Sequence, residues 1–260
     1  MLPSIARTAL ITGASHGIGA EFAWLFAAEG FNLVLVARGE TELKVLAREL
    51  KKAHGVSVTV MPRDLSEAQS VASITKELAR RKMRVEVLVN NAGIGAYGLF
   101  GKTDWKRERD LLQVNITELT ELTKALLPGM LKRKKGRILN VASMAAFQPG
   151  PLMAVYYASK AYVLSFSLAL SEETRGTGVT VTCLCPGPTR TKFHLGAKMG
   201  KSRLFRGLLL DAATVARVGY RACMKGRPLV ISGKRNRVMA FATRFSPRML
   251  AARLARMAQE

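Results

Sequence analysis

The chain has 260 residues, 48% of them hydrophobic, which is enough for one large α/β domain with a well-buried core. Its 41 Lys and Arg against 18 Asp and Glu give a formal net charge of +23, which favours anionic partners, and its three cysteines suit a reducing compartment better than a disulfide framework. Neither a signal peptide nor a membrane span is indicated, because residues 1–11 lack a long apolar core and the charge-free run 138–159 is interrupted by Pro149, Gly150 and Pro151.

The first motif is a glycine-rich turn between a short apolar strand at 7–12 and an apolar helical pattern. Its glycines, Gly13, Gly17 and Gly19, have the spacing Gly-x-x-x-Gly-x-Gly. A turn of this kind lets backbone N–H groups and the helix N-terminus approach a pyrophosphate. Taken alone, the three glycines also fit ordinary turn chemistry.

The second strand, at 32–37, ends at Arg38, and no acidic residue follows until Glu40. In dinucleotide-binding folds the residue after this strand faces the adenosine ribose, where an acid selects a free 2′-hydroxyl and an arginine accepts a 2′-phosphate. Arg38 therefore favours NADP(H) as the cofactor. The alternative is a surface arginine that happens to follow a strand.

The alternation of strand and helix then continues along the chain. The predicted elements are a helix at 40–54, a strand at 56–61, a helix at 67–82, a strand at 86–90 and a long helix at 108–131. This pattern predicts a single α/β domain, a Rossmann-type doubly wound parallel sheet with helices on both faces.

Polar residues interrupt these elements at two places. Asn90 and Asn91 end the fourth strand, on the sheet edge where ligands bind in such folds. Asn115 lies inside the long helix, where it costs helix propensity. It is either tolerated on the surface or needed as a buried polar group.

The candidate catalytic residues follow. Ser143 ends the strand-like run 137–142, where its hydroxyl can donate to a substrate oxygen. Tyr156 and Lys160 stand one helical turn apart on the same face. A nearby ammonium supplies part of the roughly 3-unit lowering that brings a phenol pKa of ~10 to neutral pH. A tyrosine and a lysine at this spacing also occur often by chance.

The remainder of the chain predicts a strand at 179–185, a rigid turn at 186–191, a helix at 211–224 and a strand at 228–232. Residues 192–207 are basic and punctuated by glycine, which fits a mobile lid. No metal site is predicted, because the three histidines are scattered along the chain.

Together these motifs resemble the short-chain dehydrogenase/reductase family over about residues 5–232. The resemblance rests on Thr12-Gly13-x-x-x-Gly17-Ile18-Gly19, Asn90-Asn91-Ala92-Gly93, Asn115, Ser143, Tyr156-x-x-x-Lys160 and Pro186-Gly187. It implies that Tyr156 is the general acid/base, that Lys160 lowers its pKa and binds the nicotinamide ribose, and that Ser143 polarises the substrate carbonyl. It also implies that Asn115 holds a proton-relay water.

The resemblance also implies a set of cofactor-binding residues, among which Asp64 and Leu65 contact the adenine. The set is Gly13, Ser15, His16, Gly17, Ile18, Gly19, Arg38, Asp64, Leu65, Asn91, Ala92, Gly93, Tyr156, Lys160, Pro186, Gly187, Thr189 and Thr191. NADP-dependent members often carry paired arginines after the second strand, whereas Gly39 follows Arg38 here, so one phosphate contact is not accounted for.

The run from Leu127 to Met130 and the run from Lys135 to Asn140 are similar to the branch that holds 3-oxoacyl-thioester and hydroxysteroid reductases. That similarity implies an apolar carbonyl substrate. The chain is further expected to be cytoplasmic, in keeping with its three cysteines, and to form a homo-dimer or homo-tetramer. Two other classes stay open. One is a nucleotide-sensing binding protein of this fold; the other is a nucleic-acid-binding protein, although no specific nucleic-acid motif accompanies the charge.

The last 27 residues, 234–260, are predicted to be a basic amphipathic extension of the catalytic domain at 1–233. Leu250, Leu254 and Met257 recur at helical spacing after Pro247, which predicts a helix with an apolar stripe flanked by arginines. This helix packs on its own domain or a second subunit, lies on an anionic membrane surface, or is solvated. The chain is then cytoplasmic or peripheral to a membrane.

Overall fold

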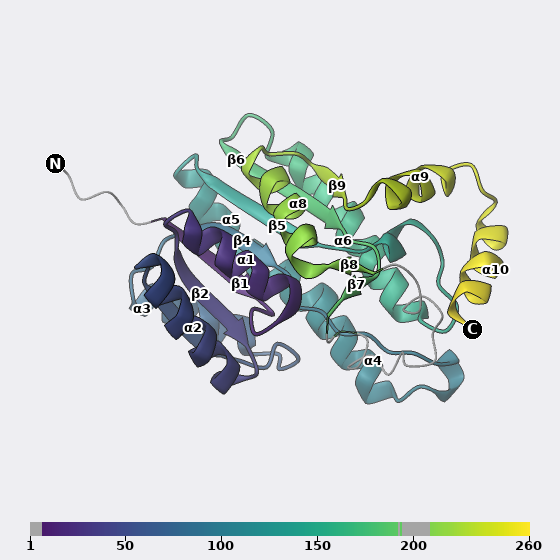
Figure 1. Cartoon of the computed structure of the whole chain (residues 1–260), viewed down its shortest axis with the longest axis horizontal. Coiled ribbons are helices and arrows are strands. Elements are labelled where there is room, and N and C mark those ends of the chain that lie inside the picture. Colours follow the sequence, from purple (N-terminus) through teal and green to yellow (C-terminus); the bar gives the residue numbers. More distant parts are fainter. Residues whose placement is uncertain (1–6, 192, 194–208) are drawn as a thin grey trace.

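A computed structural model describes residues 7–191, 193 and 209–260 of the chain (Figure 1). The predicted lid at 192–207 lies almost entirely outside the described residues.

One seven-stranded sheet forms the centre of the molecule, with strand order β3-β2-β1-β4-β5-β6-β9 and every pairing parallel. Its strands are β1 (Thr8–Thr12), β2 (Asn32–Ala37), β3 (Val58–Pro62), β4 (Val85–Asn90), β5 (Gly136–Val141), β6 (Val179–Cys185) and β9 (Leu229–Ile231). A two-stranded parallel sheet pairs β7 (Thr189–Arg190) with β8 (Leu210–Asp211) and was not predicted. The predicted fold class is confirmed.

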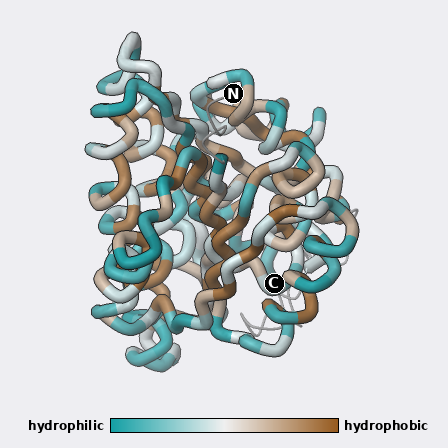
Figure 2. The backbone as a smooth tube through the Cα atoms, turned by 90° about the vertical axis from the view of Figure 1, so that its left-hand side faces the viewer, coloured by the Kyte–Doolittle hydropathy of each residue, from teal (hydrophilic) through white to brown (hydrophobic). Residues whose placement is uncertain are grey.

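Helices cover both faces of the sheet. They are α1 (Gly17–Ala28), α2 (Glu40–His54), α3 (Ser70–Arg80), α4 (Trp105–Leu112), α5 (Leu119–Lys132), α6 (Ala154–Glu173), α8 (Ala212–Met224), α9 (Lys234–Ala242) and α10 (Arg248–Gln259), with short helical turns η1 (Phe100–Lys102), η2 (Gln113–Glu118) and η3 (Met144–Phe147). Helices α1, α2 and α8 share one apolar core, and α3 and α5 share another on the opposite side of the sheet. Figure 2 shows the apolar segments running through the interior between more hydrophilic outer segments.

The strand β2 shows why this sequence forms a sheet buried on both sides. Leu33 and Leu35 belong to the core beneath α1 and α2, whereas Val34 and Val36 belong to the core beneath α3. Successive strand side chains point to opposite faces, so a continuous apolar run supplies both cores at once.

The segment predicted as one long helix at 108–131 is helical throughout, but a π-helical turn interrupts its α-helical hydrogen-bond pattern. It consists of α4, the π-helical turn η2 and α5. A π-helical turn adds one residue without a full α-helical turn, so it rotates the face that follows. Asn115 lies in this turn and is buried, with 1% of its surface exposed, so it is the buried polar group of the two alternatives.

The segment 234–260 contains two helices that pack on the rest of the domain. Asn236 on α9 donates to the Ser232 carbonyl at 2.7 Å and lies against Gly187, where an added Cβ would be 2.3 Å from its Nδ2. On α10 the buried residues are Ala251, Ala255 and Gln259, while the predicted apolar stripe faces outward. None of the helices in the described ranges has the length and apolarity needed to cross a membrane.

Candidate active site

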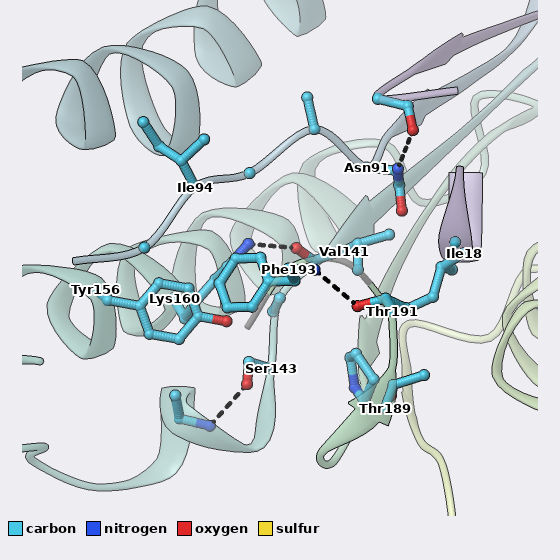
Figure 3. Close-up of a pocket in the computed structure, with 18 of the residues that line it drawn as sticks. Ile18, Asn91, Ile94, Val141, Ser143, Tyr156, Lys160, Thr189, Thr191 and Phe193 are labelled. Carbon is cyan, nitrogen blue, oxygen red and sulfur yellow. Dashed lines mark hydrogen bonds between the residues drawn. The ribbon is translucent and has the colours of Figure 1, made fainter. Parts of the chain in front are cut away.

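A cavity of about 990 Å³ opens at the carboxyl ends of the parallel strands (Figure 3). Its lining comes from the loops that follow β1, β2, β3, β4, β5 and β6, together with α6 and α9. In open α/β sheets this edge is where ligands bind, and the volume suits a dinucleotide with a small substrate.

In the glycine-rich turn, a larger residue at any of the three glycine positions would strain the backbone or displace its neighbours. Gly13 and Gly17 have positive φ angles of 63° and 60°. A Cβ on Gly19 would lie 2.2 Å from the Gly13 carbonyl oxygen. The N-cap residue of α1, His16, makes no side-chain hydrogen bond to the first helical turn. These observations fit a phosphate group held against the helix N-terminus.

Asn91 fixes this turn to the end of β4. Its Nδ2 donates to the carbonyl oxygens of Thr12 at 3.0 Å and Gly13 at 3.2 Å, the second of which is drawn in Figure 3. The Thr12 hydroxyl accepts in return from the Asn91 and Ala92 amides at 3.1 and 3.0 Å. Asn91 lines the cavity as predicted and also holds its wall, a second role that the sequence did not indicate.

The far end of the cavity carries two arginines. Arg38 is 69% exposed, and its guanidinium lies 4.0 Å from the Asp64 carboxylate, so this exposed ion pair contributes little stability. Arg63, which sequence reasoning missed, also lines the cavity and is held by hydrogen bonds to Ser73 Oγ at 2.9 Å and to the Pro62 carbonyl at 2.8 Å. Its position directly before the predicted Asp64 was the available signal.

Tyr156 lies at the centre of the cavity, with its hydroxyl directed toward Ser143 (Figure 3). The Ser143 hydroxyl also accepts from the Ala145 amide at 3.1 Å, which caps η3 and fixes the serine. Burial raises the pKa of Tyr156 well above its usual value, and the hydrogen bond with Ser143 acts in the opposite direction. The phenol is therefore protonated at neutral pH in this structure.

Lys160 lies beside this pair and is buried, with 5% of its surface exposed. Its Nζ donates to the Val141 carbonyl at 2.9 Å and is 5.8 Å from the centroid of the Tyr156 ring. Burial lowers the pKa of Lys160 to about 8. The ammonium is directed to the Val141 carbonyl, and burial of the phenol is the largest influence on the Tyr156 pKa.

Asn115 is buried behind this group. Its Oδ1 accepts from the Ile94 amide at 3.0 Å, and its Nδ2 donates to the Ile94 carbonyl and to Ser159 Oγ, each at 3.0 Å. A Cβ on Gly93 would lie 3.4 Å from both Asn115 Oδ1 and Lys160 Nζ. Asn115 therefore ties the chain after β4 to the helix that carries Tyr156 and Lys160.

Two walls of the cavity differ in kind. The glycine wall consists of the turn 13–19, whose Gly19 is buried behind the lining, and of residues 37–39, 63–66 and 91–93, where backbone approaches the cavity. The apolar wall surrounds Tyr156 and consists of Ala145, Met153, Tyr157, Phe193 and Met239. The ring of Phe193 lies 5.4 Å from that of Tyr156. Met239 belongs to α9, which the sequence placed beyond the catalytic fold.

The structure brings nearly all of the predicted site residues to this one cavity. Those that line it are Gly13, Ser15, His16, Gly17, Ile18, Arg38, Asp64, Leu65, Asn91, Ala92, Gly93, Ser143, Tyr156, Lys160, Pro186, Gly187, Thr189 and Thr191. Gly19 and Asn115 are buried behind the lining instead. Among the described residues no cluster of His, Cys, Asp or Glu could hold a metal ion.

Comparison with known proteins assigns this architecture. Residues 7–199 match the short chain dehydrogenase family. A very-long-chain 3-oxoacyl-CoA reductase of Laccaria bicolor is 39% identical over 177 residues, which are 66% of this chain and 52% of that protein. The mouse 17-beta-hydroxysteroid dehydrogenase type 3 is 34% identical, with 77% of this chain and 67% of that protein covered. This chain thus spans only about half the length of the fungal reductases that it matches.

Solved structures agree with the sequence relatives. A short-chain dehydrogenase from Sphingobium yanoikuyae in complex with NADPH superposes with a TM-score of 0.83 and 31% identity, covering 92% of this chain and 94% of that one. A family member from Burkholderia phymatum in complex with NAD superposes with a TM-score of 0.82 and 26% identity, covering 93% and 94%. The fold, the family match and the residues gathered at the cavity agree, and the chain belongs to the short-chain dehydrogenase/reductase family of oxidoreductases.

Proposed function

We propose that this protein is an NADP(H)-dependent reductase that acts on an apolar carbonyl compound or its secondary alcohol, with Tyr156 as the general acid/base. The observation that carries the proposal is the Tyr156 hydroxyl, paired with Ser143 and surrounded by the apolar wall. Relatives named as 3-oxoacyl-CoA reductases and a hydroxysteroid dehydrogenase support a substrate with a large apolar part.

The preference for the phosphorylated cofactor rests on Arg38 and Arg63 at the far end of the cavity. Two guanidinium groups provide the charge-assisted hydrogen bonds that a 2′-phosphate requires. Arg63 supplies the second basic group that the sequence after β2 lacks. Relatives have been solved both with NADPH and with NAD, so the preference depends on these two side chains.

The glycine wall would hold the dinucleotide, with the pyrophosphate at the N-terminus of α1 and the nicotinamide near Thr189 and Thr191. When bound, the cofactor supplies or accepts the hydride. The chain itself moves the proton. The Tyr156 hydroxyl donates it to the substrate oxygen, and the Ser143 hydroxyl donates a hydrogen bond to the same oxygen.

Lys160 keeps its ammonium between the Val141 carbonyl and the Tyr156 ring, where it favours negative charge on the phenol oxygen once the proton has left. We propose reduction of the carbonyl as the physiological direction, which the relatives named as 3-oxoacyl-CoA reductases support. Asn115 acts through its hydrogen bonds to Ile94 and Ser159 and is a positioning residue.

The test is NADPH oxidation with a panel of ketones and acyl thioesters by wild type, Tyr156→Phe and Tyr157→Phe. The two tyrosines are neighbours on α6, but Tyr157 packs against Gly150, so it is a matched control. We expect Tyr156→Phe to lower kcat by on the order of 1000-fold while NADPH affinity stays within about twofold. Tyr157→Phe should lose less than about tenfold. Cofactor binding without turnover of any compound would instead support a nucleotide-sensing protein.

We also propose a homo-dimer or homo-tetramer in the cytoplasm. The exposed side chains Trp105, Tyr162 and Leu168 on α4 and α6 supply apolar contact area for a second copy, and all three cysteines are free and buried. Sedimentation velocity over a range of concentrations tests the oligomer, and a monomer at every concentration would exclude it.

A further inference from the structure

The helices α9 and α10 carry an unusual density of exposed apolar side chains. Of the fourteen large hydrophobic residues that are exposed in the described part of the chain, eight lie within residues 234–260. They are Val238, Met239, Phe241, Phe245, Met249, Leu250, Leu254 and Met257, each between 49% and 75% exposed. We call these residues, with the basic residues of the same segment, the tail surface.

The same segment is strongly basic. It contains seven Lys and Arg residues and a single acid, Glu260. Glu260 accepts from Arg256 at 2.7 Å, and the described residues offer the other six cations no carboxylate within salt-bridge distance. These cations are Lys234, Arg235, Arg237, Arg244, Arg248 and Arg253. The tail surface therefore combines uncovered apolar area with uncompensated positive charge.

The orientation of α10 is fixed by contacts on its other face. Ala251, Ala255 and Gln259 are buried against the domain, and the Tyr97 hydroxyl donates to the Gln259 carbonyl at 3.0 Å. Because this face is held, the apolar and basic side chains are presented outward by a packed helix. The buried residue Gln259 shows that α10 is anchored close to its last turn.

The tail surface also adjoins the cavity. Lys234, Arg235 and Met239 belong both to α9 and to the cavity lining. In Figure 1, α9 and α10 occupy the side of the molecule opposite α2 and α3. Whatever contacts the tail surface therefore lies beside the lining of the cavity that contains Tyr156.

Three partners are compatible with part of this surface, and one fits all of it. A second copy docked through the same patch would place two sets of unpaired cations together, which opposes association. A nucleic acid would pair the charge but leave the apolar side chains uncovered. A bilayer with anionic headgroups accepts the apolar side chains at its interface and the arginines at its phosphates.

We propose that the tail surface docks this protein on an anionic bilayer, with the cavity opening at the membrane interface. Resting on the proposed function, this inference identifies the substrate class as a carbonyl compound dissolved in the lipid. The compound then passes from the bilayer along α9 to the apolar wall without crossing bulk water.

The test is co-sedimentation of the full chain with vesicles of phosphatidylcholine alone or mixed with phosphatidylglycerol, at low and high salt. One variant, Arg248→Gln/Arg253→Gln, removes charge, and another, Phe245→Ser/Leu254→Ser, removes apolar area; none of these residues lines the cavity. Lys51→Gln/Lys52→Gln is the matched control, because it removes the same charge from the exposed end of α2.

We expect binding to anionic vesicles only, weakened about 25-fold by the charge variant, since each basic residue contributes about fivefold. The apolar variant should lose at least about tenfold, and the control less than about threefold. Equal losses in the control, or unchanged binding of the apolar variant, would overturn the proposal in favour of nonspecific attraction. Self-association abolished by the apolar variant, without vesicle binding, would assign the surface to a second copy and overturn it as well.

The same variants separate this inference from the proposed function. The charge variant and the apolar variant should each oxidise NADPH with a water-soluble ketone at the wild-type rate but lose at least about tenfold with a long-chain ketone dissolved in anionic vesicles, whereas the control should keep both activities. Turnover of the soluble ketone without any vesicle binding overturns only the membrane inference. Vesicle binding without turnover of any carbonyl compound overturns only the proposed function.

Discussion

The two walls of the cavity are built by different means. The glycine wall comes from four turns within the first 93 residues, and its shape is that of the backbone, as the contacts around Gly13 and Gly19 show. The apolar wall comes from η3, α6, Phe193 and α9, and its shape is that of side chains such as Met153 and Met239. We infer that the glycine wall resists any change of residue. The apolar wall tolerates change and determines which substrate is accepted.

The largest effect should come from Gly19→Ala in the glycine wall. The added Cβ would lie 2.2 Å from the Gly13 carbonyl oxygen, which belongs to the backbone and cannot move aside as a flexible side chain would. We expect a loss of about 3 kcal/mol of stability and on the order of 100-fold in NADPH affinity. Gly101→Ala is the control, because its Cβ has nothing within 4 Å. Urea unfolding and NADPH fluorescence titration measure both effects; equal behaviour of the two variants would contradict the rigid wall.

Next in size is Arg38→Ala, at the far end of the same wall. Loss of one charge-assisted contact should weaken NADPH binding about 10- to 100-fold and leave NADH binding within about twofold. Arg63→Ala should act in the same direction. Dissociation constants for both cofactors decide the matter. Wild-type protein that binds NADPH and NADH equally well would remove the assignment of the phosphorylated cofactor.

The buried carboxyl of Glu118, in the turn that carries Asn115 between the walls, predicts a pH effect on stability. Burial, and secondarily the Glu121 charge, raise its pKa from 4.5 to about 8. The folded protein then keeps a proton that the unfolded chain releases, so stability falls as pH rises from about 4.5 to 8. Glu118→Gln should be more stable than wild type by roughly 1–3 kcal/mol at pH 8.

The difference between Glu118→Gln and wild type should shrink as the pH is lowered and level off below 4.5, where both the folded and the unfolded chain hold the proton. Urea unfolding at several pH values gives the curve. Glu121→Gln, at an exposed position on α5, is the control with a small effect. A stability difference that does not vary with pH would mean that Glu118 is ionised in the folded protein.

The smallest expected effect comes from a variant that tests the apolar wall. Tyr97→Phe removes the hydrogen bond to the Gln259 carbonyl that anchors α10. We expect a loss of about 1 kcal/mol of stability and a few-fold higher KM for an apolar substrate, with NADPH affinity unchanged. Tyr162→Phe, which loses a hydroxyl contact with Thr120 on the surface, is the control. A shift in NADPH affinity with unchanged KM would contradict the division between the walls.

The order of elements and the sites at strand ends were predictable, because the signals are local. A buried parallel strand is a short apolar run, and the residue after it, such as Arg38 or Asn91, falls on the ligand edge whatever the rest of the chain does. The boundaries shifted by a few residues; the strand predicted at 56–61 lies at Val58–Pro62.

The features that were missed depend on contacts between distant segments. Periodicity identified an apolar stripe on α10 but could not tell which face meets the domain, since the buried residues are the small Ala251 and Ala255. Met239 was assigned to an extension because nothing near it in sequence indicates the cavity. The π-helical turn at Asn115 has no amino-acid composition that distinguishes it from an α-helix. The pKa of Tyr156 is raised by burial, which sequence spacing does not reveal.

The position of β1 in the sheet also orders events in time. Thr8 pairs with Asn32 on one side and Val85 on the other, so the glycine wall is complete once four strands have met. That meeting closes the longest separation between paired strands in this sheet, 77 residues between Thr8 and Val85, whereas the pairings of β5, β6 and β9 join residues 43 to 50 apart and cost less loop-closure entropy. During refolding we therefore expect NADPH binding and turnover to return together, at the rate at which β1 meets β4.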